Sequence, residues 1–407
     1  MGNTVGIIGG GAAGMMAAIE AARSGARVTL LEGNDRLGKK ILSTGNGKCN
    51  LGNEKLDLEE YYTENPEILK RCLDVFGTAE TVDFFRGIGL MIKSKNGYLY
   101  PASEQAAVVL DVLRYAVESE GVKVVTECKV SKITRQPEKN GFLVSGNGKN
   151  YFFDKVILAC GGKAAPKTGS DGNGYDLAKS LGHSVLPTVP ALVQMKCKED
   201  YFKMVSGVRA DAQIVVMDKQ GEITRERGEL QLTDYGISGI PVFQISRVMN
   251  YMLCDRNQVE VHIDLLPDYG KKEFLELMQI REKLFREGTT EKYFTGILNK
   301  KIMLLFMKLA GIKPTDDVES ISGAKLQKVY ELCKDWRVTV VGSNPYDNAQ
   351  VCAGGVPLRE VDEDMQSLKV PGLFFAGEIL DVDGKCGGYN LQWAWCSGYL
   401  AGRGAAK

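Results

Sequence analysis

Residues 4–32 read TVGIIGGGAAGMMAAIEAARSGARVTLLE, and this stretch decides the fold. The apolar run Val5–Ile8 indicates a buried parallel strand. Gly9, Gly11 and Gly14 follow in G-x-G-x-x-G spacing. The first glycine permits a tight turn, the second lets the backbone approach a pyrophosphate, and the third lets the next helix pack close to the strand.

The residues after these glycines complete a strand–helix–strand unit. We expect a helix over Ala12–Arg23 that stops at Gly25, followed by a strand over Ala26–Leu31. Glu32 stands at the tip of that strand, 18 residues past Gly14, about the distance at which an acid accepts the ribose hydroxyls of an adenosine. A carboxylate there disfavours a 2′-phosphate, so the pattern predicts a site for FAD or NAD rather than NADP.

The composition is that of an ordinary globular protein. The chain has 407 residues, of which 44% are hydrophobic and 25% charged, enough for two or three domains with a sizeable core. Lysine plus arginine and aspartate plus glutamate number 51 each, so the formal net charge is zero and no nucleic-acid or membrane partner is expected. The apolar N-terminus lacks a basic flank and a cleavage pattern and contains three consecutive glycines, so we expect a cytoplasmic protein.

Cysteine and histidine usage argues against a metal site. The ten cysteines include no C-x-x-C pair, and the only histidines are His183 and His262. We therefore expect no zinc, no iron–sulfur cluster and no disulfide framework. His183, which follows Gly182, is predicted to cap a helix end, and His262 is predicted to be structural on an alternating strand.

A long glycine-rich loop, residues 33–53, follows the acid. Its sequence is too irregular for a helix or strand, and a loop of this length in a folded domain is usually functional. Lysines there could meet phosphates, and small residues let backbone amides converge on an anion. The candidates are Lys39, Lys40 and Lys48 for the first role and Ser43, Gly45 and Gly47 for the second.

The middle of the chain changes character after Pro190. We expect successive strands there, among them Val205–Val208 and Ala212–Met217, which indicate an inserted β-barrel, and then a cluster of helices. The predicted domains are an FAD-binding Rossmann-like domain of residues 1–190 and 346–407, a barrel-like domain of 191–267 with return strands near 337–345, and a helical subdomain of 268–336.

The α/β signals return near the C-terminus. Leu373–Ala376 indicates a buried strand that stops at Gly377. Gly387 and Gly388 then open a final helix over Leu391–Leu400. A helix start of this kind directs free amides and the positive end of the helix dipole toward a ligand.

Four segments of the chain resemble one flavoprotein group. It is the BaiN-like family, also labelled aminoacetone oxidase family FAD-binding enzymes and NAD(P)/FAD-dependent oxidoreductases. The resemblance spans nearly the whole chain, and the second and fourth segments are specific to the family. The segments are the fingerprint ending at Glu32, GKKILSTGNGKCN at residues 38–50, GELQLTDYGISG at 228–239, and residues 377–392.

The resemblance implies an α/β fold of the two-dinucleotide-binding-domain flavoprotein type. FAD would lie in a Rossmann-like domain built from both ends of the chain, with a β-barrel and a small helical subdomain inserted between them. Only one dinucleotide fingerprint is present, so no dedicated NAD(P)H-binding domain is expected, although NADH or NADPH could dock transiently as electron donor. The candidate cofactor-binding residues are Gly9, Gly11, Ala12, Ala13, Gly14, Glu32, Gly33, Lys39, Lys40, Ser43, Gly45, Gly47, Lys48, Cys49, Asn50, Val130, Ala159, Gly161, Gly377, Glu378, Asp381, Gly387, Gly388, Asn390 and Leu391.

Three functions stay open for the sequence. The first is FAD-dependent reduction of an activated C=C bond in a small enone, and one family member type assigned to unsaturated 3-oxo bile acids suggests a steroid-like substrate. The second is oxidation of a small amine with release of hydrogen peroxide, and the third is a flavin-bound interaction protein without turnover. Tyr235 is the candidate proton donor. Cys49 is the candidate redox thiol, because the charge of Lys48 would favour its thiolate, and Cys386 is its candidate partner.

Overall fold

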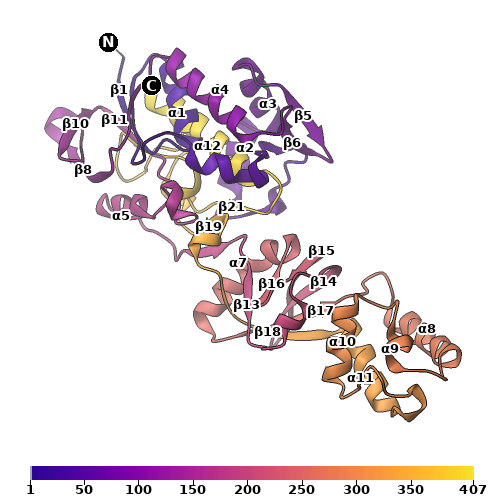
Figure 1. Cartoon of the computed structure of the whole chain (residues 1–407). Helices are drawn as coiled ribbons and strands as arrows, with labels where there is room; N and C mark the ends of the chain where they lie inside the picture. The colour runs from indigo at the N-terminus through magenta and orange to yellow at the C-terminus, as the bar shows by residue number, and fades with distance from the viewer. Residues whose placement is uncertain (1) are drawn as a thin grey trace. The chain divides into compact units, whose positions relative to one another are not determined.

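The structure is a computed structural model that describes residues 2–407 and divides into two units. The residues up to Pro190 form unit 1 together with Tyr346–Lys407, and Ala191–Pro345 form unit 2. Each unit has its own sheet and its own helices (Figure 1).

A five-stranded parallel sheet in the order β20-β11-β1-β2-β7 is the centre of unit 1. β1 (Thr4–Ile8) lies between β2 (Arg27–Leu31) and β11 (Lys155–Leu158), and β7 (Lys123–Val125) follows at one edge. The strand at the other edge, β20 (Leu373–Phe375), comes from the far end of the chain. Both ends of the polypeptide therefore build one sheet, and the carboxyl ends of its strands meet along a single edge.

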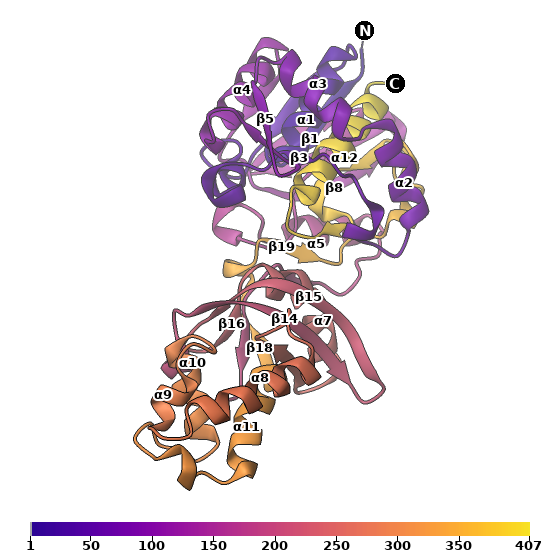
Figure 2. The same cartoon turned by 90° about the vertical axis from the view of Figure 1, so that its right-hand side faces the viewer.

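Two helices from opposite ends of the chain pack together on one face of this sheet. They are α1 (Ala12–Arg23) and α12 (Tyr389–Ala406), which lie side by side in both views (Figures 1 and 2). The contact is so close that a Cβ atom at Gly402 would lie 2.5 Å from the carbonyl oxygen of Ala17. A side chain at this position of α12 is therefore excluded by the backbone of α1.

A small antiparallel sheet covers the opposite face. Its strands are β8 (Val130–Gln136), β9 (Gly141–Gly146) and β10 (Lys149–Phe153). The ring of Phe153 lies over Gly6 of β1, where a Cβ atom would come within 2.3 Å of the ring. The core of unit 1 is thus a sheet between a helical layer and a β layer.

Shorter elements complete unit 1 around these layers. They are η1 (Lys39–Gly47), β3 (Gly52–Asn53), β4 (Tyr61–Tyr62), α2 (Pro66–Val75), α3 (Thr78–Gly87), β5 (Ile92–Lys95), β6 (Tyr98–Pro101), α4 (Ala106–Ser119), α5 (Asn173–Ser180), β12 (Val189–Ala191), β19 (Val351–Ala353), η7 (Leu358–Glu360), η8 (Gly377–Ile379) and β21 (Asp383–Gly384).

A closed barrel in the order β13-β16-β15-β14-β17-β18 forms the centre of unit 2. Its longest pair is β14 (Arg209–Asp218) with β15 (Gly221–Leu232), and every second residue of β14 from Ala212 to Val216 is buried. Closure leaves no unpaired strand edge. The other elements are β13 (Met195–Cys197), α6 (Phe202–Val205), β16 (Gly236–Ser238), α7 (Ile240–Asp255), β17 (Val259–Asp264), α8 (Lys271–Leu284), α9 (Thr290–Phe294), α10 (Lys300–Leu309), α11 (Gly323–Lys334) and β18 (Trp336–Ser343).

The predicted fold class, an α/β domain with an inserted barrel and a helical cluster, is confirmed, but two local expectations were wrong. A strand was expected at Val205–Val208, whereas the chain forms the short helix α6 up to Val205. The 16-residue helix α7 was not predicted at all. Its signals are Pro241 in the first turn and the buried residues Val242, Ile245 and Met249, which recur at helical spacing.

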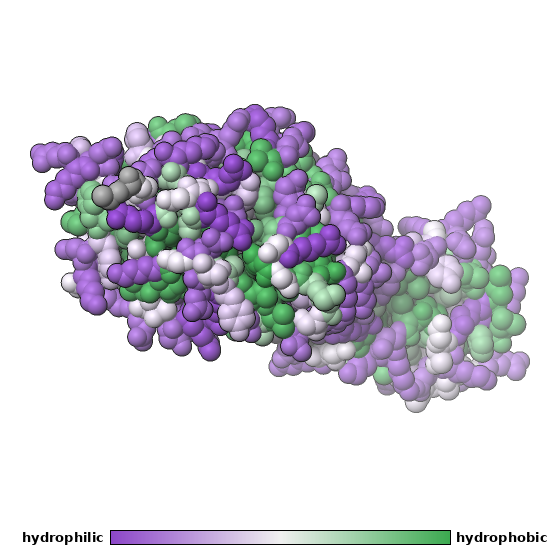
Figure 3. Space-filling view, turned by 90° about the horizontal axis from the view of Figure 1, so that it is seen from above, coloured by the Kyte–Doolittle hydropathy of each residue, from purple (hydrophilic) through white to green (hydrophobic). Residues whose placement is uncertain are grey.

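The surface of the protein is mixed in polarity. Hydrophilic side chains cover most of the face that Figure 3 shows, and apolar residues appear in patches between them. Among residues 2–407, none of the helices is both long and apolar enough to cross a lipid bilayer.

Candidate functional site

A cavity of about 340 Å³ lies at the carboxyl ends of the parallel strands of unit 1. Its walls come from the turns after β1, β2, β11 and β20 and from the first turn of α12. Ligands of open α/β sheets bind at this edge. The predicted residues that line the cavity are Gly9, Gly11, Ala12, Ala13, Glu32, Gly33, Lys39, Lys40, Val130, Ala159, Gly161, Gly377, Glu378, Asn390 and Leu391.

The glycine turn after β1 leaves the start of α1 open to the cavity. Gly9 adopts a left-handed conformation with φ 103°, and a Cβ atom at Gly14 would lie 1.9 Å from the carbonyl oxygen of Gly9. A Cβ atom at Gly11, in contrast, would have no described atom within 4 Å. The first amides of α1 therefore face open space, which is the arrangement that a pyrophosphate requires at a helix N-terminus.

Glu32 is held rigidly at the tip of β2. One carboxylate oxygen accepts a hydrogen bond from the amide of Gly10 at 2.7 Å, and the other accepts from the amide of Asn34 at 2.7 Å. Only 7% of the residue is exposed, and it lines the cavity. The acid thus joins the first glycine turn to the loop after β2.

A second acid stands on another wall of the cavity. Glu378 follows β20, and its carboxylate accepts hydrogen bonds from Lys40 Nζ at 2.6 Å and from the amide of Cys352 at 2.7 Å. Gly377, which precedes it, donates its amide proton to Ser397 Oγ at 2.8 Å. These contacts fix the carboxylate between the loop of residues 39–47 and the C-terminal part of the chain.

The loop before β3 is strained and only partly directed at the cavity. The 3₁₀ turns of η1 are interrupted by left-handed residues at Gly45, Asn46 and Gly47. Such runs persist where the surroundings hold them, and they are common at ligand sites. Ser43, Gly45 and Gly47 do not line the cavity. The side-chain oxygen of Asn50 is buried and has no hydrogen-bond partner among the described residues.

The predicted activation of Cys49 by Lys48 was wrong. Lys48 forms an ion pair with Glu104 at 2.7 Å and does not line the cavity. Cys49 is fully buried, and this burial raises the pKa of its thiol to about 11. Burial likewise raises the pKa of Cys386 to about 12, and all ten cysteines are free thiols. Burial of both thiols disfavours the thiolate that such a reaction needs, and the redox pair of Cys49 and Cys386 stays a prediction.

The N-terminus of α12 lies beside β3, which directly follows the glycine-rich loop. Gly388 caps the helix with φ 98°, and a Cβ atom there would lie 2.6 Å from the carbonyl carbon of Gly52. Asn390 uses its side chain to bind both backbone groups of Gly384, at 2.9 and 2.6 Å. Gly387, Gly388 and the buried Asp381 do not line the cavity themselves.

The stretch after β11 supplies one wall of the cavity through Thr168, Gly169, Ser170, Asp171 and Asn173. The glycine-rich run at 169–174 predicts a second close backbone approach to a cofactor, since glycine permits such an approach, and Gly169 has φ 111°. None of its residues was named among the individual site candidates. The other missed residues include Ile41, Thr44, Cys128, Lys129, Val351, Val382, Trp393 and Ala394.

Tyr235, the candidate proton donor, belongs to unit 2. It lies in the turn between β15 and β16, and its hydroxyl accepts a hydrogen bond from Asn344 Nδ2 at 3.0 Å. The residue is 36% exposed, so the hydroxyl is not locked in a core. Its catalytic role stays a prediction.

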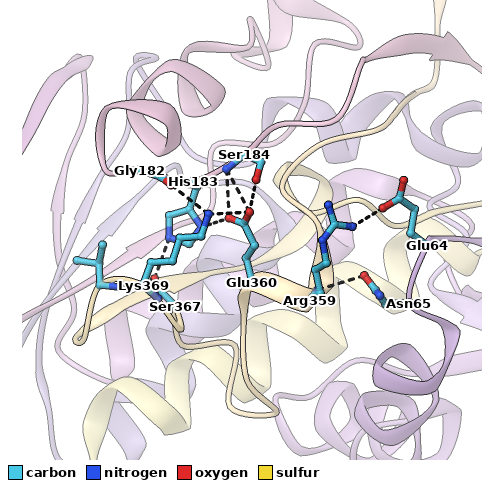
Figure 4. Close-up of polar contacts among 10 residues, drawn as sticks. Glu64, Asn65, Gly182, His183, Ser184, Arg359, Glu360, Ser367 and Lys369 are labelled. Carbon is cyan, nitrogen blue, oxygen red and sulfur yellow. Dashed lines mark hydrogen bonds and ion pairs between the residues drawn. The ribbon is translucent and has the colours of Figure 1, made fainter.

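The backbone amide of His183 caps the C-terminus of α5, and its imidazole ring is buried. Its amide binds the carbonyl of Ala178, and Gly182 adopts φ 88°, as in a helix C-cap. The ring contacts Glu360 through Nδ1 at 2.7 Å and Ser367 through Nε2 at 2.8 Å (Figure 4). None of these three residues lines the cavity.

Taken together, the parallel sheet, the glycine turn at α1 and the acid at the tip of β2 define a dinucleotide-binding protein of the Rossmann type. The geometry fits FAD: the start of α1 is open, and Glu32 is fixed where a ribose would lie. The chain belongs to the family described as "HI0933-like protein Rossmann domain", whose pattern matches residues 3–404.

Known proteins resemble the chain along its full length. It is 44% identical over 408 residues to a 3-dehydro-bile acid delta(4,6)-reductase of Clostridium scindens, covering 100% of this chain and 99% of that protein. It is 30% identical to a ribosomal RNA dihydrouridine synthase of Haemophilus influenzae, covering 97% and 96%. The solved 3-ketosteroid delta1-dehydrogenase of Sterolibacterium denitrificans shares the fold, with a TM-score of 0.52, 13% identity and full coverage of both chains.

These matches confirm the predicted resemblance to the BaiN-like flavoproteins. The protein is an FAD-dependent oxidoreductase. The assignment of individual residues to FAD stays a prediction, and the glycine turn, Glu32 and the Lys40–Glu378 pair are its best-placed members.

Proposed function

We propose that the protein reduces a C=C bond conjugated with a carbonyl group in a 3-oxo-steroid or bile-acid-like substrate. The observation that carries this proposal is the 44% identity, over the whole chain, to a protein named 3-dehydro-bile acid delta(4,6)-reductase. In such a substrate the carbonyl draws electron density from the double bond, so the β-carbon accepts a hydride and the α-carbon then needs a proton.

The chain's own residues have three tasks in this reaction. The open amides at the start of α1 would bind the pyrophosphate of FAD, and Glu32 would bind a ribose. Bound FAD supplies two-electron chemistry. A protein group must deliver the proton, and Tyr235 stays the candidate because its partly exposed hydroxyl can act as a general acid. Tyr235→Phe is expected to lower kcat at least tenfold while leaving the affinity for FAD unchanged.

An anaerobic half-reaction tests the proposal directly. The purified protein is loaded with FAD, reduced with dithionite and mixed with a 3-oxo-Δ4 steroid or bile acid. We expect the absorption of oxidised flavin to return and a product two mass units heavier than the substrate. A panel of 3-oxo-Δ4 and 3-oxo-Δ4,6 compounds that leaves the flavin reduced would contradict the assignment.

The electron donor is tested in the same apparatus. With only one dinucleotide fingerprint in the sequence, NADH or NADPH would have to dock transiently near FAD. We expect one of the two to bleach the flavin on anaerobic mixing. If neither nucleotide reduces the flavin, the enzyme takes its electrons from another reductant.

A uridine in ribosomal RNA is a second candidate substrate, because of the 30% identity to a ribosomal RNA dihydrouridine synthase. The C5=C6 bond of uracil is also conjugated with a carbonyl, so the same chemistry would serve. The balance of 51 basic and 51 acidic residues favours the small substrate, since RNA-binding proteins concentrate positive charge. Unmodified ribosomal RNA incubated with enzyme and reductant is expected to gain no dihydrouridine.

Amine oxidation is distinguished by its product. Reduced flavin would then pass electrons to oxygen and release hydrogen peroxide. We expect no peroxide above background when the enzyme is incubated in air with aminoacetone. Substrate-dependent peroxide release would favour the oxidase over the reductase.

A further inference from the structure

An ion pair in the cavity joins two residues that lie 338 positions apart in the sequence. Lys40 Nζ lies 2.6 Å from Glu378 Oε2, and the two side chains are 24% and 19% exposed. Both residues line the cavity. The other oxygen of Glu378 accepts the amide proton of Cys352, so the carboxylate cannot turn away without losing a second bond.

Glu378 lines the cavity into which the start of α1 opens, and the residue before it packs against that helix start. A Cβ atom at Gly377, the residue before Glu378, would lie 2.8 Å from Cβ of Ala13 in the first turn of α1. A pyrophosphate at that helix start carries two negative charges. An unpaired carboxylate beside it would repel FAD, and the low dielectric of a cavity strengthens such repulsion.

We propose that Lys40 is a positioning residue for FAD, which neutralises Glu378 and so allows an acid to stand beside the pyrophosphate. Lys40 also fixes the rotamer of Glu378, whose carboxylate then presents its remaining lone pairs to a neutral hydroxyl of the cofactor. The ion pair thereby joins the loop of residues 39–47 to the C-terminal wall of the cavity. The inference concerns cofactor binding and holds for any substrate that the enzyme reduces.

A double-mutant cycle on the apoprotein tests this role, with FAD affinity measured by quenching of flavin fluorescence. Lys40→Met leaves an unpaired carboxylate, so we expect the Kd for FAD to rise about tenfold or more. Glu378→Gln leaves a free cation and should keep the Kd within about threefold of the wild type. The double variant K40M/E378Q removes both charges and should recover to within about threefold of E378Q.

Two further variants separate charge from packing. Lys40→Arg keeps the charge and should bind FAD within about threefold of the wild type. Lys93→Met is the matched control, because Lys93 is ion-paired with Glu104 at 2.6 Å outside the cavity, and its Kd should not change. Circular dichroism of each apoprotein verifies folding, and Lys40→Gln replaces Lys40→Met if the latter does not fold.

The cycle has clear contrary outcomes. If K40M binds FAD as the wild type does, Lys40 has no part in cofactor binding. If K40M/E378Q binds as weakly as K40M, the loss comes from packing and the neutralising role is wrong. Neither result depends on turnover, so a failure of the proposed reductase activity would be seen separately.

Discussion

Single glycines decide whether the cofactor site can exist. Gly14 lies under the carbonyl of Gly9, at a distance where a methyl group has no room, whereas Gly11 faces the open cavity. The sequence spacing predicts three glycines with three different roles, and the structure gives each a measurable basis, the third being the left-handed φ of 103° at Gly9. Substitutions at Gly14 and Gly11 therefore separate an effect on folding from an effect on ligand binding.

Gly14→Ala is expected to destabilise the apoprotein by about 1–3 kcal/mol, because the new methyl group pushes α1 away from the turn. Gly11→Ala should leave stability within about 0.5 kcal/mol of the wild type, because its methyl group meets no described atom. It should still weaken FAD binding, since the methyl group enters the space beside the helix start. Urea unfolding of both apoproteins and FAD titrations check the contrast. Equal stability of the two variants would contradict it.

His183 gives a second prediction at the residue scale. Burial lowers the pKa of His183 below its usual 6.5, although Glu360 opposes this shift. The unfolded chain therefore binds a proton near pH 6.5 that the folded chain refuses, so stability is highest above that pH and declines as pH falls below it. We expect His183→Gln to cost about 1–3 kcal/mol at about pH 7.5. The variant should also lose part of the decline between about pH 7.5 and 5.5, measured by urea unfolding.

Arg359 supplies the control for this experiment. It lies next to Glu360 on η7 and forms an ion pair with Glu64, with both side chains about half exposed (Figure 4). Arg359→Ala should leave the pH dependence as in the wild type. Burial alone would raise the pKa of Glu360, but the hydrogen bonds from Lys369, Ser184 and His183 lower it from 4.5 to about 2. The contribution of Glu360 to the pH dependence of stability therefore falls between about pH 4.5 and 2, below the range measured for His183.

At the scale of elements, the helix bounded by glycines was predicted, whereas a helix with weaker signals that lies among strands was missed. The glycines at positions 11 and 25 bound α1, and the observed helix covers the predicted residues. α7 was missed because it follows a series of strands, and this context outweighed the helical spacing of its buried residues. The partners of Lys40 and Lys48 could not be predicted, because each ion pair joins segments far apart in the sequence.

The contact between α1 and α12 gives the prediction at this scale. Gly402→Ala would bring a methyl group within 2.5 Å of the carbonyl oxygen of Ala17, so we expect a loss of about 1–3 kcal/mol in the free energy of unfolding. Gly87→Ala, at the end of α3, meets no described atom within 4 Å and should be neutral or stabilise by about 0.5–1 kcal/mol. A loss in Gly402→Ala no larger than that in Gly87→Ala would contradict the role assigned to the contact between α1 and α12.

At the scale of the whole molecule, the residues that flank unit 2 lie close together within unit 1. The hydroxyl of Tyr346 binds Thr188 Oγ1 at 3.3 Å, and the amide of Leu186 binds the carbonyl of Gly355. We therefore expect that replacing residues 191–345 by a short glycine-serine linker leaves a protein that binds FAD within about tenfold of the wild-type affinity. It should have no reductase activity. Loss of FAD binding in a folded variant would place part of the cofactor site in unit 2.

The order of the sheet strands also bears on how the protein is made. β20 and α12 are synthesised long after the glycine turn, yet β20 completes the sheet edge and α12 supplies a wall of the cavity. A nascent chain carries the glycine turn early but lacks this wall until α12 has been translated. Stable binding of the yellow coenzyme must therefore await α12, and truncated products that stop before β20 are expected to be colourless.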